Sequence, residues 1–313
     1  MMKLCLCCLK PLKNDNTQYH PACLKKLFNT SSVPKIELNE DILQELAKKT
    51  TQEGITVQGV QKKLSLHLIS DRTENRLTLI GHPQGYILKP QSSDFNFLPE
   101  IEQITMCMAA KAKIQTPPHA LIYVNNQTLA YIIKRMDRNE DGTKNHMEDL
   151  CQLSERLTED KYKGSYEQCA KIIQKYSNQP LLDISDFYYR LLFCFITGNS
   201  DMHLKNFSLI QNTLNEWKLA DAYDLLSVNL VLKADKEETA LTLNGKKSKI
   251  QRNDFLTFAK NCKIPEKAAT KMINQILSFK EDFISIAKTE LLPPEMQTDF
   301  INLIEDRCYR LEA

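Results

Sequence analysis

The polar segment 198–207 contains residue types that can carry out phosphoryl transfer. Asp201 is followed five positions later by Asn206, which is the spacing found in phosphotransferase catalytic loops. In such loops the aspartate accepts the proton of the attacking hydroxyl, and the asparagine holds Mg²⁺. The pattern is also common by chance, so a polar loop that only caps a helix is the competing interpretation.

A second metal-holding aspartate is expected shortly after this loop. The apolar runs 207–210 and 217–220 predict a small hairpin, and Asp221 and Asp224 follow it. Kinases place their second metal-binding aspartate at this point of the chain. The spacing alone leaves both candidates open.

A loop around Gly59 is a candidate phosphate-binding element. Glycine allows backbone N–H groups to approach phosphate oxygens closely, and Lys62 and Lys63 would add positive charge. The glycines do not form the pattern G-x-G-x-x-G, so a plain hairpin turn is the alternative.

Lys89 ends an apolar strand, where a buried ammonium group needs an anionic partner. A nucleotide phosphate and a carboxylate are both candidates for that partner. The helix that follows carries Glu100 and Glu102, and a strand lysine paired with a helix glutamate is typical of kinases. We favour Glu102 as the partner, with a solvated helix face as the alternative for either glutamate.

The first 25 residues contain a separate set of metal-binding residue types. Cys5 and Cys8 are followed by His20 and Cys23, and two such pairs have the ligand types and spacing of a tetrahedral zinc site. The alternative is that these side chains only pack against the following helix, 24–28. Zinc is therefore a possible cofactor at the N-terminus.

Hydrophobic periodicity predicts strands, one long helix and again strands up to residue 134, and mostly helices beyond it. A short helix is expected at 39–49. The expected strands are 64–68, 76–80, 85–90, 119–124 and 129–134, and the later helices are 98–113, 147–153, 166–176, 184–197, 254–262, 265–289 and 294–311. This order indicates an α+β protein with a small mixed lobe and a larger helical lobe. We expect a Cys/His segment at 1–30, an N-lobe at 31–136 and a C-lobe at 137–313.

The composition of the 313 residues is that of a soluble globular protein. The 41 basic and 39 acidic residues form no basic stripe, so direct binding of nucleic acid is not favoured. No apolar run reaches the roughly 18 residues of a membrane span, and residues 1–5 do not begin a secretory leader. We therefore expect a cytoplasmic protein without a membrane partner, whose ten cysteines are mostly thiols.

Six motifs resemble, in the right order, the HipA family of serine/threonine-kinase toxins. They are Gly59-x-Gln61-x-Lys63, Tyr86–Pro90, Lys134–Arg138, His146–Gln152, Gly198–Ser208 and Leu219–Ser227. The resemblance spans roughly residues 50–290 and implies a two-lobed HipA-like protein kinase fold. The chain length and the Cys/His start look more like the short HipT form of three-component HipBST toxin–antitoxin systems.

The resemblance also implies a role for each matching residue. Asp201 is similar to the general base, and Asn206 and Asp224 match the Mg²⁺ ligands, because the pattern Tyr-Asp-Leu-Leu-Ser selects Asp224 over Asp221. The implied ATP-binding set is Gln58, Gly59, Val60, Gln61, Lys62 and Lys63 in the phosphate loop, Lys89 on the phosphates with Glu102, Lys134, Arg135 and Met136 in the adenine hinge, His203 and Lys205 in the catalytic loop, and Tyr223.

The sequence departs from the family at the self-regulatory site. Family members carry an autophosphorylated serine before the glycine loop, and the matching position here is Thr56. A phosphate adds about −1.5 to −2 charge, so a phosphorylated loop would be repelled by the ATP phosphates. We expect autophosphorylation at Thr56, with Ser65 as the second candidate.

The resemblance further implies a protein substrate and protein partners. HipA-like toxins phosphorylate an aminoacyl-tRNA synthetase and arrest growth, and HipT-type toxins favour the tryptophanyl enzyme. Antitoxins resembling HipS and HipB would offset the toxin. Two other classes stay open: a small-molecule phosphotransferase, and a nucleotide-binding interaction module. The second is disfavoured because Lys89, Asp201, Asn206 and Asp224 are all present.

Overall fold

The structure, a computed structural model, describes residues 3–14, 16–36, 63–70, 75–78, 85–125, 128–139 and 142–312. Several expected features lie outside these residues: the helix at 39–49, the phosphorylation site Thr56, and the phosphate-loop residues Gln58, Gly59, Val60, Gln61 and Lys62.

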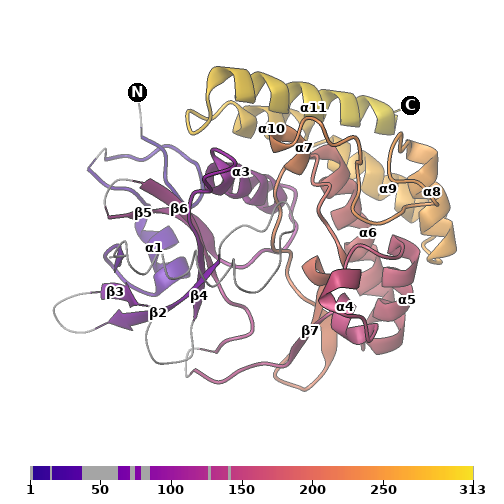
Figure 1. Cartoon of the computed structure of the whole chain (residues 1–313), viewed down its shortest axis with the longest axis horizontal. Helices are drawn as coiled ribbons and strands as arrows, with labels where there is room; N and C mark the ends of the chain where they lie inside the picture. Colours follow the sequence, from indigo (N-terminus) through magenta and orange to yellow (C-terminus); the bar gives the residue numbers. More distant parts are fainter. Residues whose placement is uncertain are drawn as a thin grey trace. The chain divides into compact units, whose positions relative to one another are not determined.

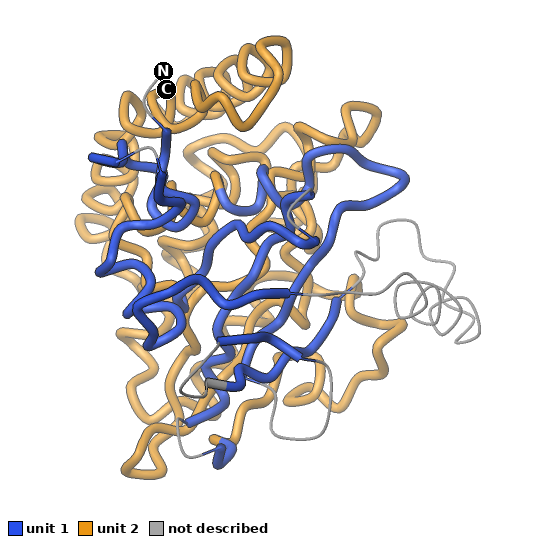
Figure 2. Tube along the Cα trace, turned by 90° about the vertical axis from the view of Figure 1, so that its left-hand side faces the viewer, with its two compact units in different colours: residues 1–103, 117–144 blue, residues 104–116, 145–313 orange. Residues whose placement is uncertain are grey.

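The chain forms two compact units, which Figure 2 distinguishes by colour. Unit 1 comprises Met1–Gln103 and Pro117–Lys144, and unit 2 comprises Ile104–Thr116 and Asn145–Ala313. The division into segments 1–30, 31–136 and 137–313 stays a prediction about folding units.

Unit 1 is built on a six-stranded sheet with the order β1-β3-β2-β4-β6-β5. The strands are β1 (Lys35–Ile36), β2 (Leu64–Ser70), β3 (Asn75–Thr78), β4 (Tyr86–Lys89), β5 (His119–Val124) and β6 (Thr128–Lys134). All neighbouring strands are antiparallel except β1 and β3. The alternating apolar residues of β2 explain its register, because buried Leu64 pairs with buried Leu88 of β4.

The N-terminal segment contacts this sheet both at the central strand β4 and at the edge strand β5. Helix α1 (Pro21–Phe28) packs on β4, where the ring centroids of Phe28 and Tyr86 are 5.6 Å apart (Figure 1). At the edge strand β5, the backbone N–H of Leu121 donates to the Leu6 carbonyl at 2.9 Å. All of β5 except Tyr123 is buried in consequence. Covering the edge satisfies backbone groups that would otherwise invite pairing with another chain.

Unit 2 is mostly helical and centres on α6 (Pro180–Ile196). The other helices of the described chain are α3 (Leu98–Lys111), which begins in unit 1, and α4 (Leu150–Leu153), α5 (Tyr166–Tyr176), α7 (Val228–Val231), α8 (Arg252–Asn261), α9 (Glu266–Leu277), α10 (Lys280–Ala287) and α11 (Pro294–Glu312). The C-terminal half of α6 is buried on all sides, and its Phe187 contacts Tyr166, Phe207 and Phe258. Among the described residues, none of the helices combines the length and the apolarity needed to cross a membrane.

A three-stranded sheet in unit 2 corrects one expected helix. The segment 147–153 begins as strand β7 (Met147–Asp149) and only then becomes α4. The sheet order is β7-β8-β9, with β8 at Ser208–Gln211 and β9 at Trp217–Leu219. Met147 pairs with Ile210, so a long-range ladder overrides the local helical pattern. The expected helix 265–289 is likewise divided into α9 and α10 near Ser278.

Candidate active site

The segment 198–207 connects α6 to β8 through a turn that requires glycine. Gly198 has φ +68°, and a Cβ atom there would lie 2.5 Å from Cδ2 of Leu303. Neither the backbone conformation nor the space admits another residue without strain. After this turn, the 3₁₀ helix η2 (Leu204–Asn206) leads into β8. The chain therefore presents Asp201 from a loop that is fixed at both ends by packed elements.

Asp201 and Asn206 are brought together by hydrogen bonds within this loop. The Asp201 carbonyl accepts from the backbone N–H of His203 at 2.8 Å and from Nδ2 of Asn206 at 2.9 Å. The Asp201 carboxylate Oδ1 accepts from the hydroxyl of Tyr162 at 2.7 Å. Burial, followed by the negative charge of Asp201, raises the pKa of Tyr162 above its ordinary value. Tyr162 therefore stays protonated and acts as the donor.

His203 and Lys205 are held by their neighbours in unit 2. The buried ring of His203 meets the Tyr162 ring edge to face at a centroid distance of 5.0 Å. Its Nδ1 accepts from the backbone N–H of Lys205 at 3.3 Å. The Lys205 ammonium forms a 2.7 Å ion pair with Asp149, which also caps α4. Asp149 thus connects the loop 198–207 to the start of α4.

Tyr223 and Asp224 follow β9, whose last residue, Leu219, pairs with Leu209 near the start of β8, where the loop 198–207 ends. The Tyr223 hydroxyl lies 2.6 Å from Ser208 Oγ and donates to the Lys205 carbonyl at 3.0 Å. Burial raises the pKa of Tyr223, so the hydroxyl keeps its proton. Asp224 has φ +56°, a left-handed conformation that is uncommon for a residue other than glycine and is found at functional sites.

Asp221, the alternative to Asp224 as a metal ligand, interacts electrostatically with Arg190. Burial lowers the pKa of Arg190, and the charges of Asp186 and Asp221 oppose that effect. Arg190 also donates to the Ala220 carbonyl at 2.6 Å. Asp221 therefore helps to compensate a buried guanidinium group.

The donor types in unit 2 fit a magnesium ion. Asn206 offers an amide oxygen and Asp224 a carboxylate, and Mg²⁺ prefers such hard oxygen ligands. The hydrogen bond from Asn206 Nδ2 to the Asp201 carbonyl assigns the amide nitrogen to the protein. The remaining oxygen of that amide is the atom suited to a cation.

In unit 1, Lys89 forms a buried ion pair with Glu102. Lys89 Nζ and Glu102 Oε1 are 2.5 Å apart, and their side chains are 5% and 1% exposed. The ammonium group also lies 5.5 Å from the centroid of the Tyr131 ring. Glu100 instead accepts hydrogen bonds from Gln91 at 2.8 and 2.9 Å, and burial raises its pKa.

The expected hinge follows the end of β6. The backbone N–H of Lys134 donates to Pro118 and that of Arg135 to Gly85, both at 2.8 Å. The Arg135 guanidinium binds both carboxylate oxygens of Asp137, at 2.9 and 2.8 Å. Burial alone would raise the pKa of Asp137, but Arg135 and Arg138 lower it on balance. This network fixes the backbone next to Met136.

Two further expected residues of unit 1 lie on or beside β2. Lys63 is exposed immediately before the strand. Ser65 lies within β2 and pairs with Ile87 of β4, so its backbone is part of the sheet.

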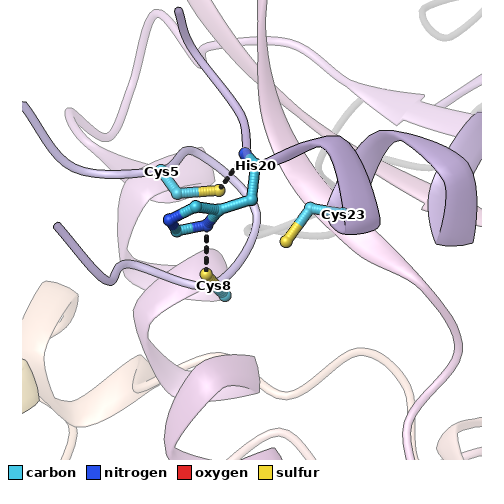
Figure 3. Close-up of side chains that lie close together, drawn as sticks. All are labelled: Cys5, Cys8, His20 and Cys23. Atoms are coloured by element: carbon cyan, nitrogen blue, oxygen red, sulfur yellow. Dashed lines mark hydrogen bonds between the residues drawn. The ribbon is translucent and has the colours of Figure 1, made fainter. Parts of the chain in front are cut away.

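The four N-terminal candidate zinc ligands lie together (Figure 3). One side-chain ligand atom from each of Cys5, Cys8, His20 and Cys23 lies within 4.8 Å of the others. Hydrogen bonding among the thiols lowers the pKa of Cys5, through its contact with Cys23, and raises the pKa of Cys8, through its own contact with Cys23. A cavity of about 700 Å³ also lies in unit 1, lined by residues such as Tyr19, Pro34 and Tyr123, and it includes none of the expected kinase residues.

Two residues of the site were not expected from the sequence. Tyr162 gives no local signal, because it meets Asp201 only through the fold. Asp149 does give one: with Gln152 it forms a capping box, a pattern of an acceptor followed three positions later by Glu or Gln. In the segment 147–153, this pattern predicts a helix that begins at Leu150 with Asp149 as its N-cap residue.

Comparison with known proteins identifies the family. The family model described as HipA-like C-terminal domain matches residues 55–282. The chain belongs to this family. A Haemophilus influenzae protein named "Putative kinase" is 28% identical over 331 residues, covering 93% of this chain and 92% of that protein. The protein named "Putative kinase Y4dM" from Sinorhizobium fredii is 30% identical over 229 residues, covering 67% of this chain and 54% of its own length.

Two solved structures share the fold of this HipA-like chain. One is from the Shewanella oneidensis toxin–antitoxin complex of HipA, HipB and operator DNA, with a TM-score of 0.67, 21% identity, and 82% of this chain and 65% of that chain covered. The other is the Helicobacter pylori proinflammatory kinase CtkA, with a TM-score of 0.55, 14% identity, and 78% and 93% covered. The expected fold class, a mixed α and β fold of the HipA kinase type, is confirmed.

Proposed function

We propose that the chain is an ATP-dependent kinase of the toxin type that phosphorylates serine or threonine hydroxyls of a protein. The observation that carries this proposal is the geometry around Asp201. Its carboxylate is oriented by Tyr162, and its carbonyl fixes the Asn206 amide 2.9 Å away. This geometry supports the proposal, because phosphoryl transfer requires a general base and a metal ligand held close to each other.

Each residue has a distinct part in the proposed reaction. The Asp201 carboxylate orients the attacking hydroxyl and takes its proton as the γ-phosphoryl group moves to the hydroxyl oxygen and ADP leaves. Asn206 and Asp224 hold Mg²⁺, which when bound neutralises charge on the phosphate oxygens. The Lys89 ammonium, kept in place by Glu102, adds positive charge toward the same phosphates.

The remaining ATP contacts are assigned by the resemblance to the family. Backbone groups of the hinge Lys134–Met136 would hold the adenine, and His203, Lys205 and Tyr223 would support the loop that faces the phosphates. The engaged N–H groups of Lys134 and Arg135 leave Met136 as the hinge residue best suited to donate to adenine. Thr56 is the proposed site of autophosphorylation.

The proposed target is an aminoacyl-tRNA synthetase, with the tryptophanyl enzyme as first candidate. The proposed neutralising partners are antitoxins that resemble HipB and HipS, with the chain acting as a short, HipT-like toxin in the cytoplasm. The likeness to the Shewanella chain, whose complex contains HipB, supports the first of these partners.

Transfer of labelled phosphate tests the proposal. The purified chain is incubated with γ-labelled ATP, alone and with bacterial lysate, beside Asp201→Asn, Asp224→Asn and the control Asp221→Asn. We expect self-labelling and one labelled protein of synthetase size, a loss of about 10²–10⁴-fold in the first two variants, and retained transfer in the control. Label in a small metabolite, or undiminished transfer by Asp201→Asn, would refute the proposal.

A further inference from the structure

The Cys/His cluster at the N-terminus is a built site that the proposed kinase chemistry does not use. Four potential ligand atoms converge from two separate parts of the segment, and the largest separation between them is 4.8 Å (Figure 3). Cys5 is fully buried and the other three are partly buried. Three thiols and one imidazole at such separations surround a volume suited to a single ion.

The first two ligands are placed by a tight turn. The backbone N–H of Cys5 donates to the Lys10 carbonyl, and that of Leu9 donates to the Cys5 carbonyl, both at 2.9 Å. Leu9 has φ +55°, so the chain reverses sharply there. The turn brings Cys8 back beside Cys5, so that both thiols reach the cluster.

The other two ligands come from the start of α1. His20 is the residue before the helix and Cys23 lies in its first turn. His20 Nδ1 lies 3.3 Å from the Cys8 sulfur, and its Nε2 lies 3.1 Å from the Pro11 carbonyl. A carbonyl can only accept, so Nε2 carries the proton and the Nδ1 lone pair faces the cluster. This second hydrogen bond is the one that typically orients a metal-bound histidine.

A backbone donor also prepares one thiol for metal binding. The His20 backbone N–H donates to the Cys5 sulfur at 3.4 Å. A hydrogen bond to sulfur favours the thiolate, which is the form that binds metal. The oriented imidazole and the N–H···S contact are not required for plain packing of the cysteines against α1.

We propose that Cys5, Cys8, His20 and Cys23 bind one structural zinc ion. Three thiolates and one imidazole complete a tetrahedral shell, so no position is left for a substrate or a water molecule. Zinc suits this set better than Mg²⁺, which prefers oxygen ligands. The ion fixes the turn at 5–10 to the start of α1, in a segment too short to have a large core of its own.

The consequence of the zinc ion extends into the sheet and α3. Residues between the first two ligands are hydrogen-bonded to the rest of unit 1. The Leu6 carbonyl accepts from Leu121 of β5 at 2.9 Å, and the Cys7 carbonyl accepts from Gln103 Nε2 at 2.7 Å. Gln103 follows Glu102, the partner of Lys89. The zinc-bound turn therefore holds the first part of α3, and with it the carboxylate of the buried ion pair.

Metal analysis of the full chain tests the zinc site. We expect about one zinc ion per chain in protein purified without added metal. Replacement by Co²⁺ should give the visible absorption of a tetrahedral ion together with a sulfur-to-cobalt charge-transfer band. A metal content near zero, with no such spectrum after Co²⁺ addition, would overturn the proposal for the intact, folded protein.

Variants test the ligand set. Cys8→Ser and Cys23→Ser should lose the zinc. Cys7→Ser, in the same turn, should keep it, because Cys7 is not among the four converging ligands and its carbonyl still accepts from Gln103. His20→Cys should keep the metal and intensify the charge-transfer band, because a fourth sulfur ligand replaces nitrogen. This variant changes a ligand without abolishing binding, so it distinguishes a change of ligand from misfolding. Equal loss in Cys7→Ser and Cys8→Ser, or an unchanged Co²⁺ spectrum in His20→Cys, would contradict the assignment.

Discussion

The hydroxyl of Tyr162 donates a 2.7 Å hydrogen bond to the carboxylate of Asp201. A hydrogen bond to the charged form of a carboxylate favours that form and fixes its rotamer. In Tyr162→Phe we expect phosphate transfer to fall by about threefold to tenfold, and the acidic limb of the pH–rate profile to move to higher pH. Rates measured between pH 5 and pH 8 test this expectation.

Tyr189→Phe is the matched control for that experiment. It removes a hydroxyl that donates to the Ala112 carbonyl at 3.2 Å, away from the catalytic loop. In Tyr162→Phe the ring remains available to contact His203, so only the hydrogen bond is lost. The same pH–rate profile in both variants would mean that Tyr162 does not act on Asp201.

From the ion pair of Lys89 and Glu102 we predict that substitutions can change stability and phosphate transfer independently. Lys89→Met leaves the Glu102 carboxylate buried without its counter-charge, and removing one member of such a pair costs about 3–5 kcal/mol. The double change Lys89→Met with Glu102→Leu replaces both charges by apolar groups and should recover most of that loss. Urea denaturation of the two variants measures the free energy of unfolding.

Activity in the same two variants is expected to behave differently. If Lys89 also serves ATP, the stable double variant still lacks an ammonium group and transfers no phosphate. Recovery of transfer in the double variant would show that the pair is structural only. Lys111→Met, which breaks a half-exposed ion pair with Asp282, is the control and should change stability by less than about 1 kcal/mol.

Local patterns in the sequence predicted the parts of the molecule whose signal lies within a few residues. The apolar run 187–196 predicted the helix before the loop, because it is longer than a typical buried strand. The spacing of the N-terminal cysteines and histidine predicted that four side chains converge, and they do. Asp201 and Asn206 are connected within one loop, so their spacing carried the information.

Features that depend on distant partners were not predictable in the same way. Met147–Asp149 is a strand only because Ser208–Ile210 lies beside it, and no local pattern reveals that partner. The contact between Tyr162 and Asp201 and the ion pair between Asp149 and Lys205 likewise join residues far apart in the chain. The break between α9 and α10 at Ser278 occurs without proline or glycine to mark it.

Asp149 combines two roles that substitutions can separate. It caps α4 by accepting from the Gln152 backbone N–H at 2.8 Å, and it pairs with Lys205. Asp149→Asn keeps a side chain suited to capping, so stability should change by less than about 1 kcal/mol. The KM for ATP should rise, because the ammonium group of Lys205 loses the anionic partner that holds it in place.

Asp149→Ala removes the cap as well and should cost about 1 kcal/mol more than the asparagine variant. Steady-state kinetics and thermal unfolding of the two proteins separate the effects. A KM for ATP that is normal in both variants would remove Lys205 from the nucleotide site.

His119 predicts a specific loss of stability in mild acid. Burial, aided by the charge of Lys26, lowers its pKa to about 3, and its Nδ1 lies 2.8 Å from Oε1 of Gln103. An unfolded histidine has a pKa of about 6.5, so below that pH the unfolded chain binds a proton that the native protein rejects. The stability that depends on the neutral form of His119 is fully present above pH 6.5 and declines as the pH falls toward 3. At pH 5.5 the loss amounts to about 1.4 kcal/mol.

His119→Asn tests this contribution, because its amide can still donate to Gln103 but does not titrate. The free energy of unfolding is measured in urea at pH 7.5 and pH 5.5, with metal content checked at both. The difference in free energy of unfolding between the parent protein and the variant should be about 1.4 kcal/mol smaller at pH 5.5 than at pH 7.5. His146→Asn, at an exposed position, serves as the control. Its difference in free energy of unfolding from the parent protein should be the same at both pH values. A constant difference for His119→Asn too would mean that the histidine takes up its proton inside the native core, at Nε2, because Nδ1 already donates to Gln103.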